Sequence, residues 1–191
     1  MKRMIFYVLL ILACFGCESK SSKETQNNER DYYALSGIQN DSLRKIEDDV
    51  YVYANNVTVK LKIIGIRDGD SADGLYGEFP VSIRLAHIDA PEKRQAFGKA
   101  AKQKLSDLCF GKTVTIVSEG KKGTYHGGRI IAEIFLEDGT NVNKTMISEG
   151  FAWHYKKYSK DKSYDALEND ARINKRGLWT DQNPVSPWNF R

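Results

Sequence analysis

The chain has 191 residues, with 29 Lys and Arg against 25 Asp and Glu and a formal net charge of +4. This length fits one core of ordinary size, and the sequence shows neither internal repeats nor a second domain. The modest basic excess suits a polyanionic partner. Many exported domains are mildly basic, however, so charge alone does not establish nucleic-acid binding.

The first 17 residues have the pattern of a bacterial secretory signal. A basic start at 1–3 precedes an apolar run over 5–13, and the chain turns polar directly after Cys17. The apolar run is shorter than the about 20 residues that span a bilayer. We expect a signal peptide of lipoprotein type over 1–17, with a lipid anchor on Cys14 or Cys17; the alternative is an ordinary cleaved signal peptide. Either way the protein is expected to be exported, as a membrane-anchored envelope lipoprotein or in secreted form.

Residues 18–56 are expected to form a polar tether. They are rich in Ser, Lys, Glu, Asn and Asp and hold too few apolar positions to bury a core. Residues 57–191 then form the single domain, which carries 22 Lys and Arg against 17 Asp and Glu, so the basic excess lies on the folded part. Its only cysteine is Cys109, so no internal disulfide can form and stability must come from packing.

The folded part combines predicted strands with predicted helices. Alternating or β-branched apolar residues with Gly-containing borders predict four strands of a small antiparallel barrel, at 58–66, 79–87, 112–118 and 129–136. Apolar residues at helical spacing predict three helices, one between Glu92 and Gly111, a shorter one ending at Gly150, and a third over 163–175. The sequence therefore predicts an α+β fold.

The densest group of reactive side chains lies in residues 83–92, Ile-Arg-Leu-Ala-His-Ile-Asp-Ala-Pro-Glu. It sets an arginine and two acids around a strand end and a proline turn. An arginine can neutralise a pentavalent phosphorus centre, one carboxylate can hold a divalent cation, and another can accept a proton from water. A further acid pair in 68–71, Asp-Gly-Asp-Ser, and a further arginine in 127–132 complete a set that suits phosphodiester cleavage.

The order and spacing of these motifs resemble the staphylococcal nuclease (thermonuclease) family. Its members carry a DGDT-like turn, an R-L-x-x-I-D-x-P-E segment and a Y-G-R segment in this order. The likeness runs from about residue 57 to residue 191, and the tail over 150–158, 176–179 and 183–188 resembles the secreted bacterial branch. The resemblance implies a five-stranded OB-fold β-barrel with about three helices, a scaffold that commonly displays nucleic acid on one face.

The resemblance also implies a calcium site. Asp68-Gly69-Asp70 by itself is typical of a hairpin turn. Asp89 closes a separate strand, and two carboxylates from different segments, with a carbonyl and waters, can hold a hard cation. By the resemblance, Asp70 and Asp89 are the carboxylate ligands of calcium and Ala90 lends its backbone carbonyl. The residues themselves would equally allow magnesium or manganese.

Three residues are expected to act on the phosphate and the water. Arg84 alternates with Ile83 and Leu85, so it faces away from the apolar side of its strand. An ordinary surface arginine would show the same pattern, and this alternative also applies to Arg129. The resemblance implies that both arginines bind the phosphate and that Glu92 is the general base. Glu92 also fits the first turn of the following helix, where the helix dipole would stabilise it.

The substrate contacts include one departure from the family pattern. Where the family often has Asp-x-Tyr-Gly-Arg, this chain has Tyr-His-Gly-Gly-Arg over 125–129, with Gly127 in place of the tyrosine. Either a contact to the substrate is weakened, or Tyr125 reaches in instead. Lys156 and Tyr158 combine charge with an aromatic face, as needed to follow a phosphate backbone and stack an unpaired base.

The resemblance thus implies a calcium-dependent endonuclease, and we expect the protein to be a monomer. It would hydrolyse DNA and RNA with low sequence specificity, prefer single strands and leave 3′-phosphate ends. One alternative is a catalytically inactive OB-fold module that binds nucleic acid or protein, since the family contains domains that have lost the acids and arginines. Another is an envelope lipoprotein whose domain is only an interaction surface. Both alternatives predict no metal-dependent hydrolysis.

Overall fold

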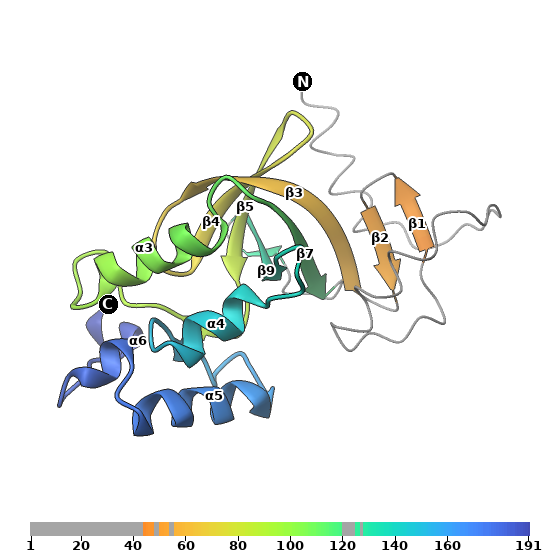
Figure 1. The fold of residues 1–191 in the computed structure, drawn as a ribbon. Helices are drawn as coiled ribbons and strands as arrows, with labels where there is room; N and C mark the ends of the chain where they lie inside the picture. The colour runs from red at the N-terminus through yellow and green to blue at the C-terminus, as the bar shows by residue number, and fades with distance from the viewer. Residues whose placement is uncertain (1–43, 48–49, 54–55, 120–124, 127) are drawn as a thin grey trace. The chain divides into compact units, whose positions relative to one another are not determined.

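The computed structural model describes residues 44–47, 50–53, 56–119, 125–126 and 128–191 (Figure 1). The predicted signal peptide, Cys14, Cys17 and Gly127 lie outside the described residues, and those expectations stay predictions. Among the helices in the described ranges, none is both long and apolar enough to cross a bilayer.

Five strands close into a barrel in the order β3 (Asn56–Ile66), β4 (Ser71–Tyr76), β5 (Phe79–Leu85), β9 (Arg129–Phe135) and β7 (Thr113–Glu119), with β7 pairing back onto β3. Strands β5 and β9 run parallel and the other barrel pairs are antiparallel. The expectation of an antiparallel barrel was therefore wrong. Strand directions cannot alternate all the way around a closed ring of five, so one neighbouring pair must be parallel. The prediction of a five-stranded OB-fold-like barrel is confirmed.

Two more strands extend the barrel sheet at its N-terminal edge. Strand β2 (Val50–Tyr53) pairs with the first residues of β3, and β1 (Arg44–Glu47) pairs with β2. The sequence predicts that these residues belong to the polar tether. The Val-Tyr-Val-Tyr sequence of β2 alternates residue types that favour strands, which explains the pairing.

Alternating burial along the strands creates the core and leaves polar residues outside. In β5, Ile83 and Leu85 are buried while Arg84 between them is partly exposed, as the sequence predicted. The predicted strands correspond to β3, β5, β7 and β9, whereas β4 was not predicted because its Ser-Ala-Asp-Gly start has low strand propensity. The barrel core is filled mainly by Leu61, Ile63, Ile83, Leu85, Val114, Ile116, Ala132 and Ile134.

Three helices match the three predicted ones; the first two lie beside the barrel, and the third packs on the second (Figure 1). They are α3 (Gly98–Cys109), α4 (Val142–Ser148) and α5 (Lys162–Ile173). Helix α3 begins later than expected, because Phe97 has a φ of 64°. This left-handed conformation cannot be part of a right-handed helix, so the helix starts only after Phe97. Glu92 therefore lies in a turn before the helix, and the expected first-turn position at the helix dipole was wrong.

The C-terminal part packs on these elements through a second apolar cluster. Strand β10 (Trp153–His154) pairs with β6 (Ile88–Asp89), which follows β5. The 3-10 helix η1 (Gly177–Thr180) and the short helix α6 (Pro187–Phe190) follow α5. The cluster consists of Trp153, Ala171, Leu178 and Trp179. This arrangement brings the C-terminal segments alongside the short strand that carries Asp89.

Candidate active site

Two buried acids from separate segments meet at one arginine. Asp70, which precedes β4, and Asp89, in β6, are 2% and 0% exposed. The Arg84 Nη1 atom forms an ion pair with Asp70 Oδ1, and its Nη2 atom lies 2.7 Å from Asp89 Oδ1. The same Nη2 atom lies 3.4 Å from the Ile88 carbonyl oxygen. Three of the residues predicted to form the site are therefore in direct contact.

Backbone contacts fix Asp70 in this position. Its carboxylate Oδ2 accepts a hydrogen bond from the Ala90 N–H over 2.7 Å, and its carbonyl accepts one from the Leu85 N–H over 2.8 Å. The preceding residue, Gly69, packs so tightly that a Cβ atom there would lie 2.7 Å from the Cβ atoms of Ala90 and Ala101. The Asp-Gly-Asp turn is therefore both the β3–β4 connection and a fixed support for one acid of the site.

Glu92 lies in the turn that leads from β6 toward α3. Its backbone N–H donates to Gln95 Oε1 over 3.0 Å, and its carbonyl accepts from the Gln95 N–H over 2.8 Å. A Cβ atom at Gly98 would lie 1.9 Å from the Glu92 carbonyl oxygen, so only glycine fits at the start of α3. The backbone of Glu92 is thus held by its neighbours, while its carboxylate is partly exposed.

A residue that the sequence analysis missed completes this group. Arg191, directly after α6, forms an ion pair with Asp89 Oδ2, and its Nη1 atom lies 3.2 Å from Glu92 Oε1. The predicted cation ligand and the predicted general base are thereby bridged. No periodicity or motif pointed to Arg191, because its position depends on how the C-terminal segment packs.

Arg129 lies on the neighbouring strand. The parallel register pairs Arg84 with Ile131, so Arg129, two residues earlier on β9, lies on the same face, roughly 7 Å along the strand. Among the side chains that the structure describes, Arg129 makes no hydrogen bond or ion pair with Asp70, Asp89 or Glu92. The backbone of Tyr125 belongs to β8 (Tyr125–His126), which pairs with the start of β9.

The segment with the predicted substrate contacts runs beside the acids. Trp153 of β10 is paired with Asp89, and the Tyr155 N–H donates to the His87 carbonyl over 2.8 Å. Lys156 and Tyr158 follow directly, and the Tyr158 side chain is 71% exposed. An exposed aromatic face beside a lysine is suited to stacking an unpaired base.

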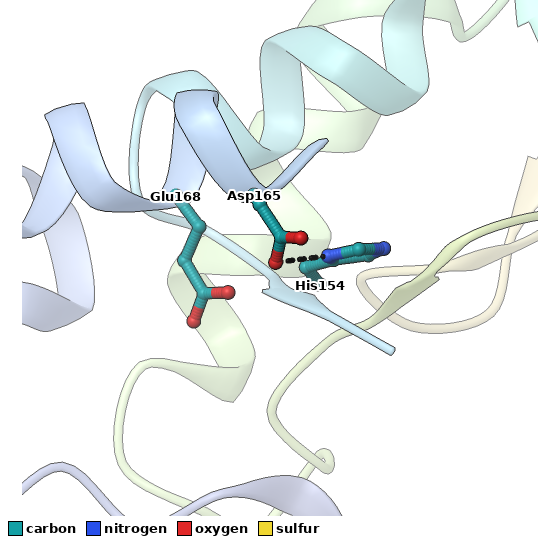
Figure 2. Close-up of side chains that lie close together, drawn as sticks. All are labelled: His154, Asp165 and Glu168. Atoms are coloured by element: carbon teal, nitrogen blue, oxygen red, sulfur yellow. Dashed lines mark hydrogen bonds and ion pairs between the residues drawn. The ribbon is translucent and has the colours of Figure 1, made fainter. Parts of the chain in front are cut away.

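Lys156 takes part in a polar group with a histidine and two acids. Its Nζ atom lies 2.8 Å from Asp165 Oδ1, and the hydrogen bond to Lys156, together with one to His154, lowers the pKa of Asp165. Figure 2 shows Asp165 and Glu168 projecting from α5 beside His154, whose Nδ1 atom lies 3.0 Å from Asp165. The three side chains have the spacing of metal ligands. Arg172 lies 2.6 Å from Glu168. This group includes an imidazole nitrogen, a donor that suits transition metals better than calcium or magnesium.

The group around Asp70 and Asp89 fits a hard divalent cation better. Both acids are almost fully buried, and the structure places positive charge between their carboxylates in the form of the Arg84 guanidinium. Carboxylate and carbonyl oxygens are the donors that calcium and magnesium take. The Ala90 N–H donates to Asp70. This contact does not involve the Ala90 carbonyl, whose expected role as a cation ligand stays a prediction.

Comparisons with known proteins point in the same direction as this geometry. A family model described as "Staphylococcal nuclease homologue" matches residues 82–181. An "Uncharacterized endonuclease" of Escherichia coli is 41% identical over 130 residues, which cover 68% of this chain and 83% of that protein. A protein with the same description from Haemophilus influenzae is 40% identical over 131 residues, 68% and 71% of the two chains. A "Micrococcal nuclease" of Shigella flexneri is 38% identical over 139 residues, 68% and 79% of the two chains.

Proposed function

Because this chain belongs to the staphylococcal nuclease family and is an endonuclease, we propose that it is a calcium-dependent enzyme that cleaves both DNA and RNA. Proteins of this family generally depend on a divalent metal, and their substrate is nucleic acid. The observation that carries the proposal is the convergence of Asp70 and Asp89 on Arg84, with Glu92 linked to the same group through Arg191. Two buried acids beside a partly exposed acid provide separate groups for cation binding and for proton transfer.

In the proposed reaction, water attacks phosphorus, the bond from phosphorus to the 5′ oxygen breaks, and this oxygen takes up a proton from solvent, so one product carries a 3′-phosphate and the other a 5′-hydroxyl. Asp70 and Asp89 would hold the cation, together with the Ala90 carbonyl. A bound divalent cation would supply Lewis-acid stabilisation of the charge that develops on phosphoryl oxygens. Glu92 accepts the proton from the attacking water, and its partial exposure leaves the carboxylate open to solvent.

The two arginines would neutralise the phosphoryl group. Arg84 has a planar guanidinium that can donate two parallel hydrogen bonds to a phosphate. In this structure its two Nη atoms pair with different carboxylates, those of Asp70 and Asp89. Arg129 lies on the same face of the adjoining strand. Lys156, Tyr158 and Tyr125 are proposed to contact the strand on either side of the scissile bond. Such contacts use the phosphate backbone and base stacking, which are largely independent of sequence and favour single strands.

Hydrolysis by the purified full-length chain tests this proposal. Single-stranded DNA, duplex DNA and RNA would be incubated with calcium, magnesium or manganese, and with a chelator. We expect cleavage of all three with calcium, fastest for single strands, and none with the chelator. Products should resist extension by a polymerase until a phosphatase removes the 3′-phosphate. Folded protein that cleaves nothing with any of the three metals would contradict the proposal.

We further propose that the protein is exported and anchored by a lipid on Cys14 or Cys17. The support is the basic, apolar and polar order of the first residues. Labelling of bacterial cells that express the chain with a radioactive fatty acid is expected to mark the wild-type protein. The label should disappear when the modified cysteine is replaced by alanine. An unlabelled protein released into the medium would contradict the anchor.

A further inference from the structure

Arg191 joins two acids to which the proposed reaction gives different tasks. Its Nη2 atom pairs with Asp89 Oδ2, and its Nη1 atom lies 3.2 Å from Glu92 Oε1. The other oxygen of Asp89 is paired with Arg84, so each oxygen of this buried carboxylate has its own arginine. One guanidinium therefore connects a proposed cation ligand to the proposed general base.

The segment that carries this arginine is packed against the turn that carries Glu92. The Gln95 side chain contacts both parts, because its Oε1 atom accepts from the Glu92 N–H over 3.0 Å and its Nε2 atom donates to the Val185 carbonyl over 2.6 Å. On α6, Trp188 stacks on Tyr155 with ring centroids 5.5 Å apart and an angle of 7° between the planes. The arginine is thus placed by a packed element.

We propose that Arg191 is a positioning residue for hydrolysis, which holds the Glu92 carboxylate in place for proton transfer. This inference rests on the proposed function. The Glu92 side chain is 35% exposed, so burial alone does not fix its rotamer. A general base works only within hydrogen-bond reach of the water that it deprotonates, and small misplacements cost a large part of the rate. The rigid fork of a guanidinium can hold two carboxylates at a fixed separation, which an ammonium group does less well.

Two other roles for Arg191 make different predictions. If Arg191 only anchored α6, replacing it would lower stability and activity to the same extent whether or not the Glu92 carboxylate is present. As a competitor for the cation at Asp89, it would restrain the enzyme, and its removal would raise activity at low calcium. The positioning role predicts instead a loss of turnover that depends on the presence of the Glu92 carboxylate.

The experiment compares full-length wild-type protein with Arg191→Gln and Arg191→Lys. Arg176→Gln is the matched control, because Arg176 is exposed and pairs with Asp170 over 2.6 Å, so the control removes the same charge and one acid contact elsewhere. On a single-stranded DNA oligonucleotide at saturating calcium, Arg191→Gln is expected to lower kcat about 10- to 100-fold while KM changes less than about twofold. Arg191→Lys should lose less, and the control should match the wild type.

A Glu92→Gln background separates positioning from the other roles. If Arg191 acts through Glu92, adding Arg191→Gln changes the residual rate by less than about twofold, since contacting residues are not additive. Full multiplication of the two losses, an unchanged kcat in Arg191→Gln, or a higher rate at low calcium would each overturn the inference.

The positioning role can be tested even if one Arg191 variant does not fold. Thermal unfolding of each protein shows which variants are folded, and if Arg191→Gln is not, the same comparison of kcat, KM and the Glu92→Gln background is made with Arg191→Lys. Wild-type protein that cleaves nothing with any metal would overturn the proposed function itself. Wild-type cleavage with unaffected Arg191 variants would overturn only this inference.

Discussion

Arg84 donates through Nη2 to Asp89 Oδ1 over 2.7 Å, and this ion pair ties the end of β5 to the buried strand β6. The same guanidinium pairs with Asp70, so it lies between the two carboxylates that we propose as cation ligands. Arginine and cation would therefore compete for the same oxygens. If Asp70 and Asp89 hold a cation, the Arg84 donors would be free to bind a substrate phosphate.

Arg84→Met removes the arginine that competes with the cation, and its stability with and without calcium tests this competition. In the presence of a chelator, the free energy of unfolding should fall by about 3 kcal/mol, because two buried carboxylates lose a shared partner. Calcium should restore more stability to the variant than it adds to the wild type, since it binds only the folded state. Urea unfolding with chelator and with calcium measures both effects. Arg94→Met, at an exposed position, is the control. If calcium stabilised Arg84→Met and the wild type equally, the competition between Arg84 and the cation would be contradicted.

Asn143 is expected to be the most sensitive polar residue outside the acid cluster. Its amide is fully buried, accepts from the Ile134 N–H over 3.0 Å and donates to the carbonyls of Ala86 and Ala132 over 3.0 and 3.1 Å. Asn143→Ala should lower the free energy of unfolding by about 2 to 3 kcal/mol, because buried backbone groups lose their partners. Urea denaturation measures this loss. Asn169→Ala, at an exposed position on α5, is the control. If Asn143→Ala lowered the free energy of unfolding no more than this control, the buried hydrogen bonds of Asn143 would not be needed for stability.

The ion pair between Arg67 and Asp73 should make a pH-dependent contribution. A hydrogen bond from Arg67 holds the pKa of Asp73 below its ordinary value of 3.8. Because the folded pKa is the lower one, the pair stabilises the fold above the unfolded pKa, and this stability is lost as pH falls through the folded pKa. The Arg67 side chain is 52% exposed, so the contribution is no more than about 1 kcal/mol.

Asp73→Asn tests this contribution. The variant should be less stable than the wild type at neutral pH, and the difference should shrink as the solution is acidified below the ordinary carboxyl pKa. Chemical denaturation at several pH values gives the two stability curves. A difference that stays constant or grows toward acid would contradict the assigned pKa direction.

Cys109 should be chemically inert in the folded protein. The side chain is fully buried, its Sγ atom donates to the Leu105 carbonyl over 3.2 Å, and burial raises the pKa of the thiol to about 12. Because the thiolate is the reactive form, iodoacetamide at mildly alkaline pH should leave the Cys109 peptide unmodified in native protein and label it fully in guanidinium. Mass spectrometry of the peptides distinguishes this site from Cys14 and Cys17. Rapid native labelling would show that the helix face opens.

Local patterns predicted four of the five barrel strands and the three longer helices, and the resemblance to a family supplied the expected roles of the site residues. The outward face of Arg84 followed from the alternation with Ile83 and Leu85, which are 0% and 1% exposed. The contact between Asp70 and Asp89 through Arg84 could not be derived from spacing, because it depends on how β3, β4 and β5 close. The resemblance implied that Asp70 and Asp89 share a cation, but it did not predict that Arg84 lies between them.

The start of helix α3 and the position of Arg191 were not predicted, for local physical reasons. Helix α3 was expected to start near Glu92, but Phe97 adopts a positive φ, and Gly98 must pack on the Glu92 carbonyl. Apolar spacing cannot report either constraint. Arg191 was missed because its contacts depend on tertiary docking of a four-residue helix, for which no periodicity exists.

The single-turnover cleavage rate of Glu92→Gln at saturating calcium tests the proposed role of Glu92, with exposed Glu137→Gln as the control. If Asp70 and Asp89 hold the cation and Glu92 transfers the proton, the variant should bind calcium and single-stranded DNA as the wild type does and cleave about 100-fold more slowly or worse. A cleavage rate within about twofold of the wild type would contradict the central claim, because general-base catalysis would then not depend on this carboxylate.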